Sequence, residues 1–267
     1  MRPGYIYILF FILLLTFCKK KEQPSDSDPV QIATTTGPAA GTQILKIYDA
    51  DISSGGTHDN ATFNYFYDSN YRINLIKEYD TTLSPTFVIT KINYKETTYS
   101  YNSFGKVDVE TVTSYSPSLS VQTNNYFYDA SQRMRKMVIY YNSTYSDSIV
   151  YTYFTNKIAS KQASHSSSDT IYLNSGNQNL DSVKYVAAGY TYKYLMDGKV
   201  NAFKTHDYAV NPYDISPYAC DQNIRKIKTP FAVYNYSYTY NSNNYPAFYT
   251  TILSSGSGCN VTFYYNN

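Results

Sequence analysis

Tyrosines and polar residues alternate along much of the chain. In the segment VYNYSYTYN, residues 233–241, every second residue is a tyrosine, and Asn, Ser or Thr lies between. A period of two places all the tyrosines on one face of a β-strand and the polar side chains on the other. Residues 107–110, VDVE, alternate in the same way. The pattern predicts strands with one aromatic or aliphatic face and one polar face.

A short motif recurs between these strands: aromatic, any residue, aromatic, Asp or Asn, three variable residues, Arg or Lys, then an aliphatic. Clear copies occupy residues 65–73, 99–107 and 126–134. The Asp or Asn can accept a hydrogen bond from the backbone two residues on, which starts a turn. Gly105, Gly198 and Asn244 stand where a residue with positive φ is expected. The motif therefore predicts a β-hairpin, with the basic residue at the solvent-exposed start of the returning strand.

The spacing between successive copies varies more than a propeller or solenoid allows. An antiparallel meander tolerates this variation, because only neighbouring hairpins must pair. We expect an all-β fold over residues 44–267, a single domain made of an antiparallel meander of repeated β-hairpins. With roughly 12 to 16 strands, it should form a large, strongly curled sheet or a partly closed, barrel-like shell.

Composition agrees with this fold class. The chain has 34 Tyr, 13 Phe and no Trp, and only 16% of its residues are charged. Aromatic and β-branched side chains fit a pleated, half-buried surface. The formal net charge is +2, and its basic residues are dispersed along the chain. No nucleic-acid partner is expected from such a distribution.

The N-terminal residues predict export. An apolar run from Tyr5 to Phe17 follows Arg2 and ends at Cys18, before three lysines. The run is shorter than the roughly 20 residues that cross a bilayer as a helix, so it reads as a signal segment over residues 1–18. Residues 19–43 are rich in Pro, Ser, Thr, Asp and Gly, which predicts a flexible tether.

Residues 15–18, LTFC, resemble the lipobox of bacterial lipoproteins. The resemblance implies that Cys18 is acylated, becomes the first mature residue and anchors the chain in a membrane. Cleavage by an ordinary signal peptidase and an uncleaved anchor are the alternatives.

The Tyr-Asp pairs at residues 67–68 and 128–129 resemble the YD repeats of Rhs-type proteins. Over about residues 65–265 the chain resembles envelope lipoproteins of the Bacteroidota that carry degenerate YD-like hairpins. This resemblance implies an exported, membrane-anchored protein, expected at the outer membrane. Both the periplasmic and the surface-facing orientations stay open.

Two further cysteines, Cys220 and Cys259, remain in the mature chain. Because exported proteins meet an oxidising compartment, we expect these two to form a disulfide. A Cys or His arrangement with zinc-ligand spacing is absent from the sequence.

The sequence gives little support for catalysis. His58, His165 and His206 are the only histidines, and no known nucleophile, phosphate-binding or metalloprotease motif is present. Residues 49–60 hold several Asp and Ser oxygens around two glycines, but they lack the Gly and Glu that an EF-hand loop needs. We expect no enzyme activity, no cofactor and no metal.

One long segment, residues 206–223, interrupts the repeat. Binding residues often lie on long ordered loops, so its candidate ligand-binding residues are Asn211, Tyr213, Tyr218 and Asp221. A cap over an open sheet edge is an alternative role for this segment.

The expected function is a binding or structural role in the cell envelope, with a glycan or another envelope protein as partner. A glycan-binding component of an outer-membrane import system is one alternative, because sugars stack on tyrosines and bond to Asn and Asp. A hydrolase with a site formed by loops is the other. Short Asp-Ser-aliphatic segments, at residues 147–149 and 181–183, resemble an O-glycosylation signal and would need exposed loops or strand ends.

Overall fold

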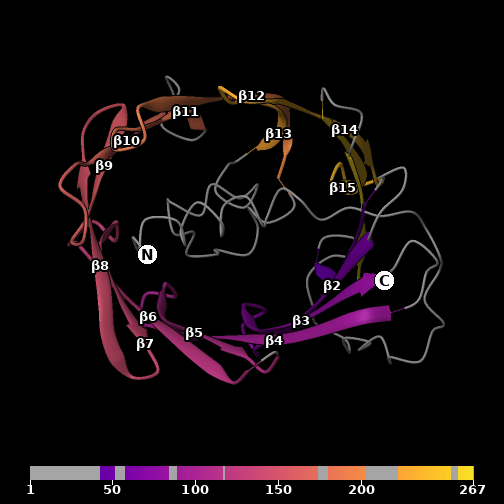
Figure 1. Ribbon diagram of the computed structural model, residues 1–267, viewed down its shortest axis with the longest axis horizontal. Coiled ribbons are helices and arrows are strands. Elements are labelled where there is room, and N and C mark those ends of the chain that lie inside the picture. Colours follow the sequence, from indigo (N-terminus) through magenta and orange to yellow (C-terminus); the bar gives the residue numbers. More distant parts are fainter. Residues whose placement is uncertain are drawn as a thin grey trace.

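The protein is a closed antiparallel β-barrel. The computed structural model describes residues 43–51, 58–83, 89–116, 118–173, 180–201, 222–253 and 258–266. Within these ranges, 16 strands follow one another around a ring in chain order, and β1 pairs with β16 to close it (Figure 1). The expected meander is confirmed, and the sheet closes completely. No helix in the described ranges is long and apolar enough to cross a membrane.

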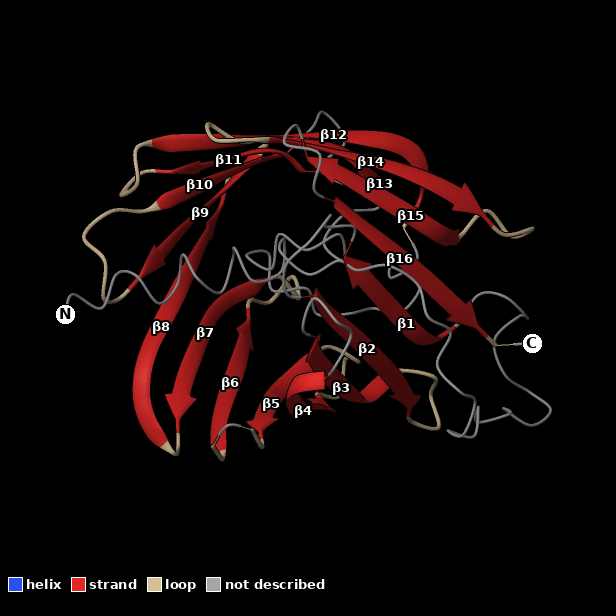
Figure 2. Ribbon diagram, turned by 45° about the vertical axis from the view of Figure 1, so that its right-hand side comes forward, coloured by secondary structure: helices blue, strands red, loops and turns tan. Residues whose placement is uncertain are grey.

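The strands run at a slant to the barrel axis, as barrel closure requires (Figure 2). Their bounds are β1 Ile44–Asp51, β2 His58–Tyr67, β3 Ile73–Leu83, β4 Ile89–Tyr101, β5 Val107–Ser114, β6 Ser120–Tyr128, β7 Met134–Tyr141, β8 Thr144–Tyr153, β9 Lys157–Gln162, β10 Asp169–Leu173, β11 Leu180–Tyr185, β12 Tyr190–Val200, β13 Gln222–Lys228, β14 Val233–Tyr240, β15 Pro246–Leu253 and β16 Gly258–Tyr265.

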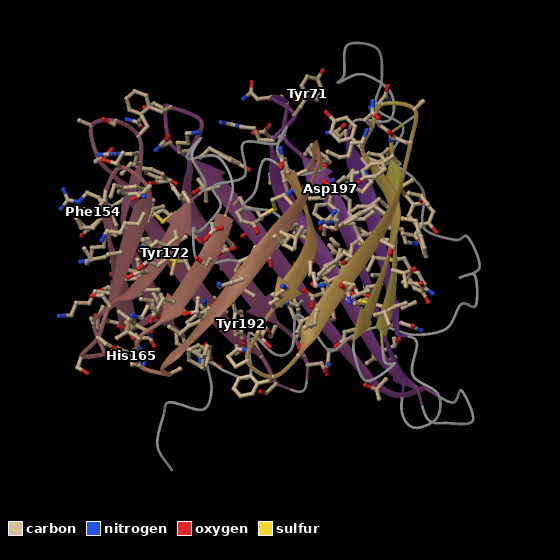
Figure 3. The ribbon with its side chains drawn as sticks, turned by 90° about the horizontal axis from the view of Figure 1, so that it is seen from above. Tyr71, Phe154, His165, Tyr172, Tyr192 and Asp197 are labelled. Atoms are coloured by element: carbon tan, nitrogen blue, oxygen red, sulfur yellow. The ribbon has the colours of Figure 1, made fainter. Side chains whose placement is uncertain are left out.

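The two ends of the barrel differ. One end carries the motif turns, the start of β1 and the end of β16, and we call it the turn rim. Its turns lie at residues 68–72, 102–106, 129–133, 154–156 and 241–245. The far rim is the opposite end, with connections at residues 142–143, 163–168, 186–189 and 229–232. Figure 3 shows Tyr71 of the turn rim at the top and His165 of the far rim at the bottom.

A β-bulge follows four of the motif turns. In each case the last tyrosine of the entering strand pairs with the first residue of the returning strand, and the residue before that tyrosine pairs two positions further on. One residue of the returning strand is therefore extra, and it increases the local twist that a barrel needs. The extra residues are Asn74, Asp108, Arg135 and Ala247.

The tyrosine face of the strands is the inner face of the barrel. Burial raises the pKa of Tyr236 on β14, and the nearby charges of Tyr234 and of Asp49 on β1 raise it further. Asp49 and Tyr236 interact although β15 and β16 lie between their strands. Side chains that are separated by two strands along a sheet can approach each other only on its concave face, which is the inner face of the barrel. Val107 and Val183 on this face are almost fully buried. The core is thus a lining of the inner wall, in two clusters that meet at Tyr99.

Candidate functional site

The motif turns share one hydrogen-bond pattern. The side-chain oxygen of Asp68 accepts from the backbone N–H of Asn70 at 2.8 Å and of Arg72 at 2.9 Å. Asn102, Asp129 and Asn241 accept from the residues two and four positions on in the same way, at 2.9 to 3.1 Å. The predicted turn chemistry is confirmed, and it extends to a second N–H.

The position three residues after the Asp or Asn has positive φ in each of these turns. Gly105 has φ 76° and Asn244 has φ 62°, as the sequence predicts. Tyr71 and Gln132 occupy the same position with φ 60° and 59°. Residues other than Gly, Asn or Asp rarely adopt this backbone conformation. The turn hydrogen bonds therefore hold Tyr71 and Gln132 in it.

The basic residue of the motif does not simply point into solvent. Arg72 folds back onto Asp68, with 2.6 Å between Nη2 and Oδ2, and its guanidinium lies 4.2 Å from the ring centre of Tyr101 on β4. Arg133 repeats this arrangement with Asp129, at 2.7 Å, and with the Tyr153 ring on β8, at 4.8 Å. Each arginine therefore links its own turn to the next hairpin.

Tyrosine hydroxyls at the turn rim link five strands to the strands before them. In these strands the last inward-facing tyrosine donates to the first carbonyl of the preceding strand: Tyr128 to Val107 at 2.7 Å, Tyr153 to Met134 at 2.8 Å and Tyr265 to Pro246 at 2.7 Å. Tyr67 and Tyr101 donate in the same way to the carbonyls of Ile44 and Ile73. These bonds were not predicted from the sequence. Their signal is that the motif position next to Asp or Asn is Tyr in each clear copy, never Phe.

These phenols are hard to ionise. Burial, together with the charge of Asp129, raises the pKa of Tyr153 to about 12, although Arg133 acts in the opposite direction. Burial and the neighbouring Tyr190 raise the pKa of Tyr192 to about 12. The inner-wall tyrosines are therefore neutral hydrogen-bond donors and packing groups at physiological pH.

Below the tyrosines, toward the far rim, the inner wall carries carboxylates. Asp147 is buried and accepts from Ser164 Oγ at 2.5 Å and from Gln162 Nε2 at 2.7 Å. Burial opposes its ionisation, but these hydrogen bonds outweigh burial and lower its pKa. The pair register places the following charged residues on the inner face: Asp49, Glu78, Asp80, Lys95, Glu110, Asp147 and Asp169.

The outer wall has the opposite charge. The same register places these charged residues on it: Lys46, Lys77, Glu96, Lys136, Lys157, Lys161, Lys184, Lys193, Lys226 and Lys228. Thr, Ser and Asn occupy many of the remaining outward positions, as on β14, where Asn235, Ser237 and Thr239 are exposed. The barrel thus has an acidic inner wall and a basic, hydroxyl-rich outer wall.

An aromatic stack lies on the outer wall beside β3 and β4. The rings of Tyr79 and Tyr94 are 4.8 Å apart, and those of Tyr94 and Tyr115 are 5.0 Å apart. Glu96 accepts from the hydroxyls of Tyr94 and Tyr115, and pairs with Lys77 at 3.2 Å. Tyr79 is 40% exposed and Tyr115 46%. Stacked rings beside an ion pair can contact both the C–H faces and the hydroxyls of a sugar.

A pocket of about 350 Å³ lies on the outer wall at β8 and β9, near the far rim. Val150, Thr152, Ala159 and Lys161 line it, together with residues of the 163–168 connection. Its described lining offers the Lys161 cation and several hydroxyls, and it does not include Cys259, the predicted site residue that the structure describes.

Most predicted site residues lie outside the described ranges: Cys18, Asn211, Tyr213, Tyr218, Cys220 and Asp221. Cys259, at the start of β16, forms a disulfide whose partner is outside those ranges. The pairing of Cys259 with Cys220 therefore stays a prediction.

Of the remaining sequence candidates, the structure describes the side chains of His165 and of two serines in the Asp-Ser-aliphatic segments. His165 is exposed in the connection after β9. Among the described residues, no three His, Cys, Asp or Glu side chains are grouped as metal ligands. Ser148 and Ser182 of the Asp-Ser-aliphatic segments are buried within β8 and β11, so these two positions lack the exposure that modification would need.

Comparison with solved structures finds proteins of similar fold. No family model matches the chain, and no curated protein matches it. Among solved structures it is similar to a porin-like protein from Bacteroides uniformis, with 13% sequence identity and a TM-score of 0.42, over 84% of this chain and 97% of that one. Over the residues that the structure describes, the chain is a 16-stranded antiparallel meander barrel.

Proposed function

We propose that this protein is an exported lipoprotein of the outer membrane, anchored through Cys18, whose barrel stands in water beside the bilayer. Its role is binding or structural and not catalytic, and it involves no nucleic acid. The observation that carries the proposal is the charge on the outer wall. A membrane-spanning barrel needs an outward apolar band about 25 Å tall, and each lysine at mid-membrane costs about 2 to 4 kcal/mol.

Strand length supports the same conclusion. A strand that crosses a bilayer needs about 9 to 11 residues at a tilt near 45°. β9 has 6 residues, β10 has 5 and β11 has 6. Lys161 and Lys184 lie on the outer faces of β9 and β11. This side of the barrel is too short and too charged to face lipid tails.

The position of the first strand at the turn rim is compatible with an N-terminal tether. The backbone N–H of Gln43 donates to the Asn266 side chain at 2.9 Å, and the N–H of Asn266 donates to the Gln43 carbonyl at 2.8 Å. The chain therefore enters the barrel at the turn rim, on the seam between β1 and β16. The predicted tether, residues 19–43, would join that rim to the membrane in which Cys18 is anchored, without fixing which rim faces the bilayer.

The anchor can be tested in cells by metabolic labelling with an alkyne fatty acid. The native chain should incorporate the label and sediment with outer membranes, whereas Cys18→Ser should lose both properties. Cys220→Ser is the matched control and should keep them. Labelling that survives in Cys18→Ser would refute the anchor.

A glycan is the second candidate partner, favoured by the outer aromatic stack. Two of its three rings are well exposed, and the Lys77–Glu96 pair lies beside them. A glycan array probed with the soluble barrel should give hits that Tyr115→Ala removes and that Tyr172→Ala, on the outer face of β10, does not. An array without hits would leave the structural role.

A further inference from the structure

The far rim presents apolar tips between β11 and β14. Phe231, in the β13–β14 turn, is 78% exposed, and Val186, in the β11–β12 turn, is 42% exposed. The two turns have the sequences TPFA, residues 229–232, and VAAG, residues 186–189. Neither turn contains a charged residue. Exposed apolar side chains are therefore gathered at the far-rim ends of these strands, without a charge in either turn.

The Phe231 turn is held rigidly. Thr229 Oγ1 accepts from the N–H groups of Phe231 at 3.1 Å and Ala232 at 2.9 Å, and the Thr229 N–H donates to the Ala232 carbonyl at 2.9 Å. The Phe231 ring also meets Tyr190 edge-on, with 5.8 Å between ring centres. The fold therefore fixes the ring in its exposed position.

Lysines lie directly behind these tips on the outer wall. Lys184, Lys193 and Lys228 are exposed, each near the far-rim end of its strand. Lys193 is directly opposite Lys228 in the β12–β13 register. Like charges in that position are destabilising. An anionic partner would remove this repulsion.

We propose that this patch, Val186 and Phe231 with Lys184, Lys193 and Lys228, docks on an anionic lipid surface. The apolar tips would enter the headgroup layer while the lysines contact lipid phosphates. Interfacial binding commonly combines these two kinds of contact. An acidic polysaccharide would match the lysines but would leave Phe231 in water. The proposal depends only on described residues and not on the anchor at Cys18.

The geometry allows docking on the anchoring membrane. The predicted tether of residues 19–43 could extend to about 80 Å. β12, with 11 residues, spans about 36 Å at most. The tether is therefore long enough for the barrel to lie down or turn over, so that its far rim reaches the bilayer.

Vesicle co-sedimentation tests the proposal with residues 19–267, the expected mature chain without its cysteine, which contains every strand of the ring. We expect binding to vesicles of phosphatidylglycerol and phosphatidylethanolamine that weakens with salt, and little binding to phosphatidylcholine. Phe231→Ser should weaken binding roughly tenfold, and Lys193→Gln about fivefold. Phe104→Ser, at the turn rim and 67% exposed, is the matched control and should bind as the native chain does.

Three results would overturn the proposal. One is equal binding to both kinds of vesicle. Another is an equal loss of binding in Phe104→Ser. The third is tight binding to a soluble acidic polysaccharide that Phe231→Ser leaves unchanged, which would identify a polyanion site. Circular dichroism of each variant would separate a binding defect from a folding defect.

Discussion

The hydroxyl of Tyr128 on β6 donates to the carbonyl oxygen of Val107, the first residue of β5, at 2.7 Å. Val107 is itself almost fully buried, so its carbonyl has little access to water. The bond joins the turn end of the β6–β7 hairpin to the turn end of the β4–β5 hairpin before it. Because it recurs around the turn rim, it sets the approach of successive hairpins and favours one curvature of the sheet.

Replacing Tyr128 by Phe removes this bond and keeps the ring. We expect a loss of about 1 to 2 kcal/mol in unfolding free energy, because a buried carbonyl is left unpaired. Tyr172→Phe, at an exposed position on β10, is the control and should change stability little. Urea unfolding followed by circular dichroism measures both. Equal, small effects would show that the Tyr128 bond contributes nothing.

The positive-φ position of the motif predicts opposite effects at two turns. Gly105→Val should destabilise the fold by roughly 1 to 2 kcal/mol, because a β-branched side chain is strained there. Gln132→Gly should stabilise it, by about 0.5 to 1 kcal/mol, because it relieves the same strain at φ 59°. Thermal unfolding of both variants measures these shifts. A neutral Gly105→Val would contradict the turn geometry.

These turns show how far local chemistry carries a prediction from sequence. The Asp or Asn, the positive-φ residue and the alternating tyrosines all act within a few residues, so their spacing alone predicts hairpins. Barrel closure depends on the total number of strands and on their tilt, which no single hairpin contains. The pairing of Gln43 with Asn266 across the seam joins opposite ends of the chain, and a local pattern cannot predict it.

Because of the bulges, strand alternation in the sequence does not predict which charged residues lie on the inner wall and which on the outer wall. Alternation alone would place Ile73 and Leu75 on one face, but the extra residue Asn74 shifts the register, and Ile73 shares the inner face with Ile76. Counted from there, Glu78 falls on the inner face and Lys77 on the outer. Without knowledge of the bulge, the face of the strand on which each charged residue lies cannot be determined.

The tyrosine lining predicts loss of stability at alkaline pH. Tyr153 and Tyr192 have folded-state pKa values of about 12, above the ordinary value near 10. As pH rises, the unfolded chain therefore loses phenolic protons first. Stability should be retained below about pH 10 and fall between about pH 10 and 12. Urea unfolding midpoints over that range test this, and a flat profile would contradict the buried phenols.

The disulfide of Cys259 has an assignable partner. Peptide mapping of the mature chain under non-reducing conditions should recover Cys259 linked to Cys220, with Cys18 carrying lipid. Cys220→Ser should then expose one titratable thiol and lower the unfolding free energy by roughly 3 to 4 kcal/mol in the chain-entropy account. A Cys18–Cys259 peptide would contradict both this pairing and the lipid anchor.

Size-exclusion chromatography of residues 19–267 without detergent would show whether the barrel stands in water or belongs in the bilayer. We expect a soluble, folded species with the β-sheet circular dichroism spectrum of the native chain, and no conductance when it is added to a planar bilayer. Aggregation that only detergent reverses, together with channel conductance, would contradict it and would place the lysine-bearing wall in the membrane after all.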